Sequence, residues 1–387
     1  MKARWIIFGL AASTACQAPD AHRSDPPGLA LEEISRLGTM DGAGSALTSV
    51  SGVALTDSTV LVLEASPARV AVFSRDGAWL RDFGRQGEGP GEFRRPTRLG
   101  IVGGEVWVGD PAGRRLELFL ADGSPLRSFR WQVAPDSMGV QAFPSAPLAD
   151  GSILAGPGNL ELGSASRGWV KHRAYFRATA EGENLGEVYR EELVSSDFVA
   201  GEFPDGGVFV GMHPIPEFPL VALYPDGSGF VAVERLAARG PGEAFFRVRV
   251  FSVGGDVETD ISVPYGPVPA DGWLDRYLRE IEDDMMERSG AVDPQTVDAF
   301  RDALTDRAYY PPVTRVVAGA DGSIWIRREE SAADSVRWDV LARNGEPLGR
   351  LSTPTELRLH LASLEEVWAV ELNDLDVPFV VQMRVLR

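Results

Sequence analysis

The feature that most constrains the fold is an internal repeat, in which a turn is followed each time by an apolar strand. The turn is often Asp-Gly, which suits the positive φ angles of a tight hairpin. Recurrence of one short unit along a chain is typical of propellers and other repeat architectures. The six copies are LTDSTVLVLE (55–64), VGGEVWVGD (102–110), LADGSILAGP (148–157), YPDGSGFVAVE (224–234), GADGSIWIRRE (319–329) and ASLEEVWAVE (362–371).

A second predicted hairpin follows each of the first five copies, so each unit has four strands, named A to D here. The sixth unit, PFVVQMRVLR (378–387), stops after one further strand. Successive four-stranded units predict an all-β, six-bladed β-propeller, and 42 Gly and 27 Pro scattered between short apolar runs agree with a turn-rich protein. The missing strand is expected from the N-terminus, because LEEISRLG (31–38) resembles the D strands WLRDFG and PLRSF. The second hairpins span 68–84, 114–129, 172–189, 246–263 and 336–352.

The glycine-rich stretch GRQGEGPGEFRRPTRL (84–99) raises the possibility of a phosphate-binding loop. Such a loop needs a helix that starts directly behind the glycines. Here the glycines lie between strand D of blade one and strand A of blade two, and no helix is predicted after them. We therefore expect a tight crossing between two blades.

The same stretch carries a family resemblance. The pattern G-x-G-x-x-F-x-x-P in GEGPGEFRRP resembles NHL-repeat propellers, and GGEVWVGDPAGRRLELFLADGSPLRSF continues the likeness through blade two. The resemblance covers residues 80–131. It implies a protein that binds proteins, peptides, RNA or small ligands, although a minority of such propellers are lyases or lactonases. The family therefore leaves the function open.

The N-terminus, MKARWIIFGLAASTAC, has the layout of a bacterial secretory signal, with a positive start and an apolar stretch too short to span a bilayer. Small residues lead to Cys16, the single cysteine, in a pattern that resembles a lipobox. An ordinary secretory signal is the alternative. With a lipobox, the chain divides into a signal peptide (1–15), an acylated Cys16 with a flexible tether (16–28) and the propeller (29–387).

The predicted location and charge limit the partners. By resemblance to other lipoproteins, Gln17 in place of Asp indicates no inner-membrane retention, so a lipid anchor in the outer membrane of the bacterial envelope is expected. The formal net charge is −18. Nucleic acid is not expected as a partner, because binding to its phosphates needs a basic surface.

Long segments occur only at the D–A and B–C connections, which share one face of a propeller. We expect all of them at one rim, where loops held by a rigid scaffold tend to carry function. This rim is called the loop-rich rim below. The segments are 84–96, 157–170, 192–217, 235–244 and 266–311.

The longest insertion, 266–311, is predicted to contain two helices. The first (271–290) has Asp271 as its expected N-cap, and the second (293–304) has Asp293 as cap and Pro294 at its first position. Two interpretations stay open, a lid over the channel mouth and a helical hairpin that plugs or buttresses the rim. The apolar stripes consist of Trp273, Leu274, Tyr277, Leu278, Ile281 and Met285 in the first helix and Val297, Phe300 and Leu304 in the second.

Alignment of the blades places Arg98, Arg315 and Arg358 at equivalent positions near the start of strand A, the innermost strand, with Arg94 and Arg95 nearby. Guanidinium groups around one channel mouth could hold a carboxylate or phosphate through bidentate hydrogen bonds. The alternative is ordinary cross-strand pairing, with Arg358 across from Glu371 and Arg98 beside Asp110. The carboxylates that recur at the end of strand B are Glu64, Asp110, Glu234, Glu329 and Glu371.

Trp107, Trp325 and Trp368 occupy equivalent positions on strand B and are expected in the core between blades. His360 lies on strand A of blade six, where it can face the channel, and His213 lies in an insertion on the same rim. The four histidines, which also include His22 and His172, have no metal-ligand spacing, but propeller lyases and lactonases assemble metals from dispersed residues.

These patterns predict a binding or scaffolding propeller that recognises a protein, a peptide or a small anionic ligand on its loop-rich face, with no cofactor. The alternative is a metal-dependent lyase or lactonase with calcium or zinc at the channel mouth. No catalytic residue can be named. The candidate ligand-binding residues are Arg94, Arg95, Arg98, Arg315, Arg358 and His360.

Overall fold

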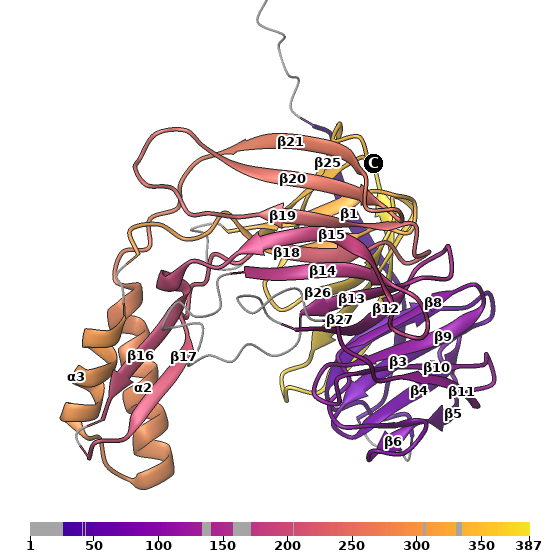
Figure 1. Ribbon diagram of the computed structural model, residues 1–387, viewed down its shortest axis with the longest axis horizontal. Helices are drawn as coiled ribbons and strands as arrows, with labels where there is room; N and C mark the ends of the chain where they lie inside the picture. Colours follow the sequence, from indigo (N-terminus) through magenta and orange to yellow (C-terminus); the bar gives the residue numbers. More distant parts are fainter. Residues whose placement is uncertain are drawn as a thin grey trace, which may run out of the picture.

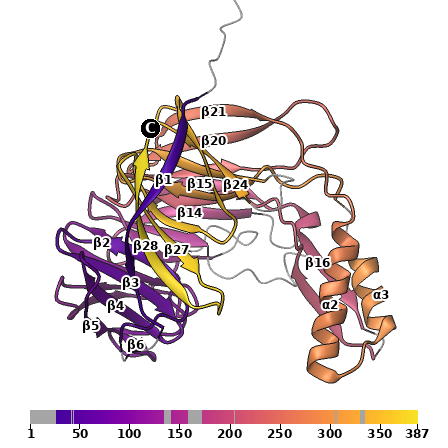
Figure 2. The same cartoon turned by 180° about the vertical axis from the view of Figure 1, so that it is seen from behind.

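The computed structural model describes residues 26–387, apart from 41, 43, 134–140, 158–171, 204, 305–306 and 330–334. The strands form six four-stranded antiparallel units in the predicted order, so the fold is a six-bladed β-propeller (Figures 1 and 2). The predicted signal peptide, Cys16, His22 and most of the tether lie outside the described residues, as does most of the insertion 157–170.

The first three blades each take four strands that are consecutive in the chain. Blade one consists of β2 (Val50–Leu55), β3 (Thr59–Ala65), β4 (Ala68–Ser74) and β5 (Trp79–Phe83); blade two of β8 (Arg98–Val102), β9 (Glu105–Asp110), β10 (Arg115–Phe119) and β11 (Pro125–Phe129); blade three of β12 (Ala142–Pro147), β13 (Ile153–Pro157), β14 (His172–Ala178) and β15 (Asn184–Glu192).

Blades four and five follow the same plan, whereas blade six takes its outermost strand from the N-terminus. Blade four consists of β18 (Leu220–Leu223), β19 (Gly229–Glu234), β20 (Ala244–Ser252) and β21 (Val257–Tyr265); blade five of β22 (Val313–Ala318), β23 (Ile324–Arg328), β24 (Ser335–Leu341) and β25 (Pro347–Pro354); blade six of β26 (Arg358–Ala362), β27 (Glu366–Leu372), β28 (Pro378–Leu386) and β1 (Gly28–Leu37).

The predicted closure by the N-terminal strand is confirmed. β1 pairs antiparallel with β28 from Ala30 opposite Leu386 to Leu37 opposite Val380, and Figure 2 shows the two strands side by side. Gly28 and Leu29 also pair in parallel with β25 of blade five. Because β28 ends on the face of the short C–D turns, β1 begins on that face, which is opposite the loop-rich rim. Closure removes the open sheet edges that would invite pairing with other chains.

The core is divided among the blade interfaces. Each neighbouring pair of blades encloses its own cluster of buried apolar side chains, including the pair formed by blades six and one. Trp325 and Trp368 are fully buried, and Trp107 is 7% exposed, which confirms the predicted placement of the three tryptophans between blades. The Asp-Gly turns are also confirmed, since Gly151 and Gly227 have φ angles of 82° and 72°, a region that glycine reaches easily.

Two insertions combine into a small second module at one end of the molecule, called the appendage here (Figure 1). The insertion 192–217 supplies a short 3-10 turn, η1 (Ser195–Asp197), and a two-stranded hairpin, β16 (Phe198–Glu202) and β17 (Val208–Met212). The insertion 266–311 supplies helices α2 (Trp273–Ser289) and α3 (Pro294–Ala303). The predicted apolar stripes of both helices meet the hairpin through Val199 and Phe209.

The helix starts were predicted in part. Asp293 caps α3 as expected, because its side chain accepts a hydrogen bond from the backbone N–H of Gln295 at 3.2 Å, and Pro294 follows. Asp271 does not cap α2, so that prediction was wrong. Gly272 is the N-cap, in a left-handed conformation with φ 66° and no side-chain bond. In the described part of the chain, no helix is long and apolar enough to span a membrane.

The appendage joins the blades through a buried ion cluster. The side chain of Arg307 is 5% exposed and its guanidinium donates to Asp197 at 2.8 Å, with Glu217 at 2.9 Å. Asp197 also accepts the backbone N–H of Glu217 at 2.9 Å. These residues come from the two ends of the hairpin insertion and from the segment after α3, so the cluster ties both insertions together at their base.

Candidate functional site

A cavity of about 500 Å³ lies among the innermost strands of the ring. Residues of β2, β8, β18, β22 and β26, which are strands A of blades one, two, four, five and six, form most of its wall. The cavity is therefore the central channel of the propeller. A volume of this size is typical of sites for small molecules. No residue of α2 or α3 lines it, so the helices do not form its lid in this structure.

The three predicted arginines occupy one structural position. Arg98 lies opposite Gly109, Arg315 opposite Arg327 and Arg358 opposite Val370. Each partner stands two residues beyond the equivalent tryptophan of strand B. Arg98 and Arg315 line the cavity, whereas Arg358 is exposed. Arg358 still acts electrostatically on Arg315 and His360, which places it at the channel mouth.

The expected pairing of these arginines with strand-B carboxylates was wrong. Glu371 instead binds Arg36 of β1, and Arg98 donates to the Ser145 hydroxyl. Glu64 and Asp110 on strand B lie directly opposite Arg69 and Arg115 on strand C. Each carboxylate is therefore already paired with the arginine opposite it. Within the described ranges, neither Arg315 nor Arg358 has a hydrogen bond or an ion pair.

The arginines of blades five and six repel one another instead. Arg315 and Arg327 are directly opposite on neighbouring strands, an arrangement of like charges that is destabilising. The pKa of Arg315 is lowered by burial and then by Arg327 and Arg358. Arg315, Arg327 and Arg358 are called the arginine cluster below. Among the described residues, the Glu329 carboxyl group responds to this cluster: burial raises its pKa, and the charge of Arg327 opposes that change.

His360 lies beside this cluster and lines the cavity. The pairing of β26 with β27 shifts between Leu359 and Leu361, so His360 is the extra residue of a β-bulge. Bulges of this kind re-aim a side chain and are frequent near functional sites. Burial lowers the pKa of His360 to about 3, helped by Arg315 and Arg358. The imidazole is therefore neutral at pH 7.

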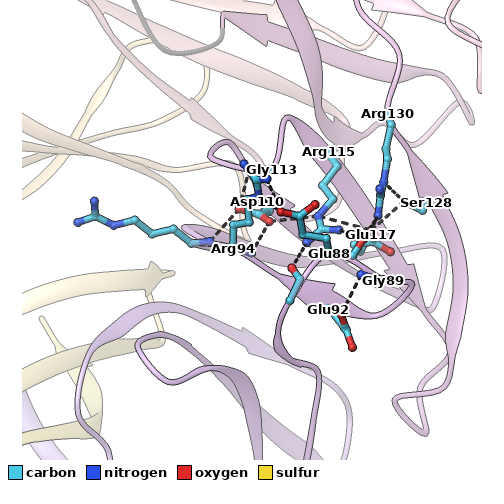
Figure 3. Close-up of polar contacts among 12 residues, drawn as sticks. Glu88, Gly89, Glu92, Arg94, Asp110, Gly113, Arg115, Glu117, Ser128 and Arg130 are labelled. Carbon is cyan, nitrogen blue, oxygen red and sulfur yellow. Dashed lines mark hydrogen bonds and ion pairs between the residues drawn. The ribbon is translucent and has the colours of Figure 1, made fainter.

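The glycine-rich segment is a crossing between blades, as predicted, and its backbone binds a carboxylate at the end of β9. The Asp110 carboxylate accepts the backbone N–H groups of Arg94 at 2.8 Å and Arg95 at 3.0 Å (Figure 3). The buried Arg115 guanidinium donates to Asp110 at 3.1 Å and to the carbonyl oxygens of Gly87 and Glu88. The amides of Arg94 and Arg95 are thus already bound to a carboxylate and are not available to a phosphate.

The remaining candidates are spread over the molecule. The Arg94 side chain pairs with Glu88, and neither Arg94 nor Arg95 lines the cavity. His213 packs against Trp273 in the appendage, with ring centroids 4.9 Å apart, and His172 is buried in β14. Within the part of the chain that the structure describes, no three His, Cys, Asp or Glu side chains lie close enough to share a metal ion.

Sequence reasoning missed two features of this site. Arg327 was overlooked because no other blade has an arginine at this position of strand B. The arginine pair RR in IWIRRE could have marked it. The pairing of strand-B carboxylates with strand C was also missed, although Glu64 and Arg69 share with Asp110 and Arg115 the same five-residue spacing. That spacing fits two residues facing each other across a short B–C connection.

The comparison with family models agrees with the fold. A family described as a 6-bladed β-propeller matches residues 37–111. A protein of Bacteroides fragilis is 13% identical, with a TM-score of 0.48, over 92% of this chain and 96% of its own. The PQQ-bound aldose sugar dehydrogenase of Streptomyces coelicolor is 13% identical, with a TM-score of 0.45, over 94% of this chain and 100% of its own. No curated protein sequence matches the chain. With TM-scores below 0.5, the two solved structures support no argument about this chain.

Proposed function

We propose that this protein is a binding propeller that holds a small ligand with a carboxylate or phosphate group at the loop-rich mouth of its central channel. The observation that carries the proposal is the arginine cluster, whose members repel one another and have no hydrogen-bonded acid among the described residues. The chain has a net charge of −18, and the buried carboxylates Glu64, Asp110 and Glu191 are each paired with an arginine.

The energetics favour an anion at this place. Like charges directly opposite in a sheet are destabilising, so the cluster costs stability in the ligand-free protein. A bound anion would convert that repulsion into attraction, and guanidinium groups bind carboxylate and phosphate bidentately. Arg98 and Arg315 both reach the cavity. The site therefore offers guanidinium groups from two sides of the channel.

The test is a thermal-shift series with inorganic phosphate and with acetate on the chain starting at residue 26. Binding to the folded state should raise the free energy of unfolding by about 2.7 kcal/mol at 100 times the Kd. Arg315→Gln should lose this shift, yet without ligand it should be as stable as the unmodified protein or up to about 1 kcal/mol more stable, because one repulsive charge is gone.

The matched control is Arg127→Gln, which removes the same charge from an exposed side chain of β11, 3.6 Å from Glu105. It should keep the shift in full. The proposal fails if no anion stabilises the protein, or if both variants respond alike.

The metal-dependent alternative has less support: a catalytic zinc needs three protein ligands, and the described residues offer no three His, Cys, Asp or Glu side chains close enough to share a metal ion. His172, His213 and His360 belong to blade three, the appendage and blade six. The resemblance to NHL-repeat propellers is compatible with a binding role and remains a proposal.

We also propose that Cys16 anchors the protein to the envelope through acyl chains, as its lipobox-like setting suggests. Two acyl chains give stable anchoring where one is marginal. Cells fed labelled palmitate should label the unmodified protein, whereas Cys16→Ala should stay unlabelled and leave the membrane fraction. Equal labelling of both would contradict lipidation at this cysteine.

A further inference from the structure

The charge around the channel mouth suggests how many negative charges the ligand brings, an inference that rests on the proposed anion site. The Arg98 and Arg315 side chains line the channel, and Arg327 and Arg358 act electrostatically on Arg315. Among the described residues, the Glu329 carboxyl group senses this cluster, since Arg327 opposes the burial that raises its pKa. A single negative charge on the ligand would leave the mouth strongly positive.

The other carboxylates of the cavity lie at its opposite end. Asp226 and Glu366 line the channel on the side of the short A–B turns, and Glu366 already accepts a hydrogen bond from Gln382 at 2.8 Å. The strands that separate the two ends are about 15 Å long at roughly 3.3 Å per residue. These carboxylates therefore do not neutralise the arginines. They make the far end of the channel negative, whereas the loop-rich mouth is positive.

His360 adds a hydrogen-bonding group without adding charge. The bulge between Leu359 and Leu361 places it in the cavity wall. The groups that face it are Arg315 on β22 and Arg358 on its own strand. A neutral imidazole can donate one hydrogen bond and accept another, so it can bind an oxygen of an anion held by the two arginines.

We propose that the mouth takes a group with two negative charges, such as a phosphate ester, a sulfate ester or a pair of carboxylates, and that His360 hydrogen-bonds this group. The dianion would sit between blades five and six, where Arg315 and Arg358 come from neighbouring strands A. Its charge would offset Arg315 and Arg358, which add to the effect of burial in keeping His360 neutral in the free protein. Binding should therefore favour the protonated imidazole.

The sign of the pH effect follows from that coupling. In the free protein the pKa of His360 is about 3, and a bound dianion raises it, so binding takes up a proton as the pH falls below the pKa of the bound state. Affinity should rise with falling pH, by at most tenfold per pH unit for one proton. Sulfate is the suitable probe because it stays doubly charged throughout this range.

The experiment measures the Kd of sulfate and of formate by titration calorimetry at constant ionic strength, at pH 7 and pH 5. Sulfate should bind at least tenfold more tightly than formate, and more tightly at pH 5 than at pH 7. Arg358→Gln, at an exposed position, should reduce the preference for sulfate. His360→Gln should remove the pH dependence of sulfate binding while keeping the preference at pH 7.

Each outcome is decisive. Equal affinity for sulfate and formate would overturn the dianion proposal and leave the anion site standing. Sulfate binding with the same pH dependence in the unmodified protein and in His360→Gln would overturn the role of His360. Failure of every anion to bind would instead overturn the proposed function. Succinate and phenyl phosphate, compared with sulfate, then distinguish paired carboxylates from phosphate esters.

Discussion

Replacing Arg307 by alanine is expected to destabilise the appendage by about 3–5 kcal/mol, the usual cost of breaking a buried ion pair from one side. The guanidinium pairs with Asp197 and Glu217, whose side chains are 1% and 0% exposed. Burial already raises the pKa of Asp197, which Arg307 counteracts. Without Arg307, two carboxylates would stay buried close together. Hydrogen exchange of the amides in α2 and α3 should accelerate accordingly.

Arg239→Ala is the matched control for this prediction. Arg239 contacts the same Glu217 at 3.0 Å, but its side chain is 68% exposed, so its loss should cost less than about 1 kcal/mol. Equal effects of the two substitutions, or unchanged exchange in Arg307→Ala, would show that the ion cluster does not hold the appendage.

Deletion of the closing strand should have the second large effect. A chain that starts at residue 39 lacks β1 and so loses Leu29 and Leu37, which are 8% and 0% exposed. Removal of a buried leucine typically costs 2–5 kcal/mol, so a loss of at least about 4 kcal/mol is expected, and the open edge of β28 should promote association. Urea denaturation and size-exclusion chromatography measure the two effects.

A chain that starts at residue 26 is the control, and it should keep the stability of the longer protein. Addition of a peptide covering 26–38 should restore part of the stability of the shorter chain, because the strand would return to its place between β28 and β25. If the chain from residue 39 unfolds at the same urea concentration as the control, the ring does not depend on β1.

The sequence determined the architecture through signals that are local and repeated. The Asp-Gly turns set the hairpins, and the incomplete sixth unit together with LEEISRLG predicted the closing strand. The helices of the appendage were predicted from their apolar spacing, which stays visible without knowledge of a partner. The hairpin β16–β17 was not predicted, because the helices against which it packs lie about 70 residues further along the chain. A short hairpin also shows no period comparable to that of a helix.

The candidate site was predicted less completely. Alignment alone brought Arg98, Arg315 and Arg358 to one structural position, because equivalent residues of a repeat fall at equivalent places. It could not decide which carboxylate each arginine meets, since that depends on which residues face each other across strands B and C. The bulge at His360 was also hidden, because an extra residue in one strand is visible only in the pairing with β27.

The path of β1 also determines how the molecule bears mechanical load. A pull on the chain at residue 26 acts along β1, whose pairing with β28 extends from Ala30 to Leu37. Tension in that direction shears the ladder, so its hydrogen bonds share the force instead of opening one after another. The pull is also applied on the face opposite the arginine cluster. A molecule held by its N-terminal segment would thus resist extraction while the channel mouth points away from the point of attachment.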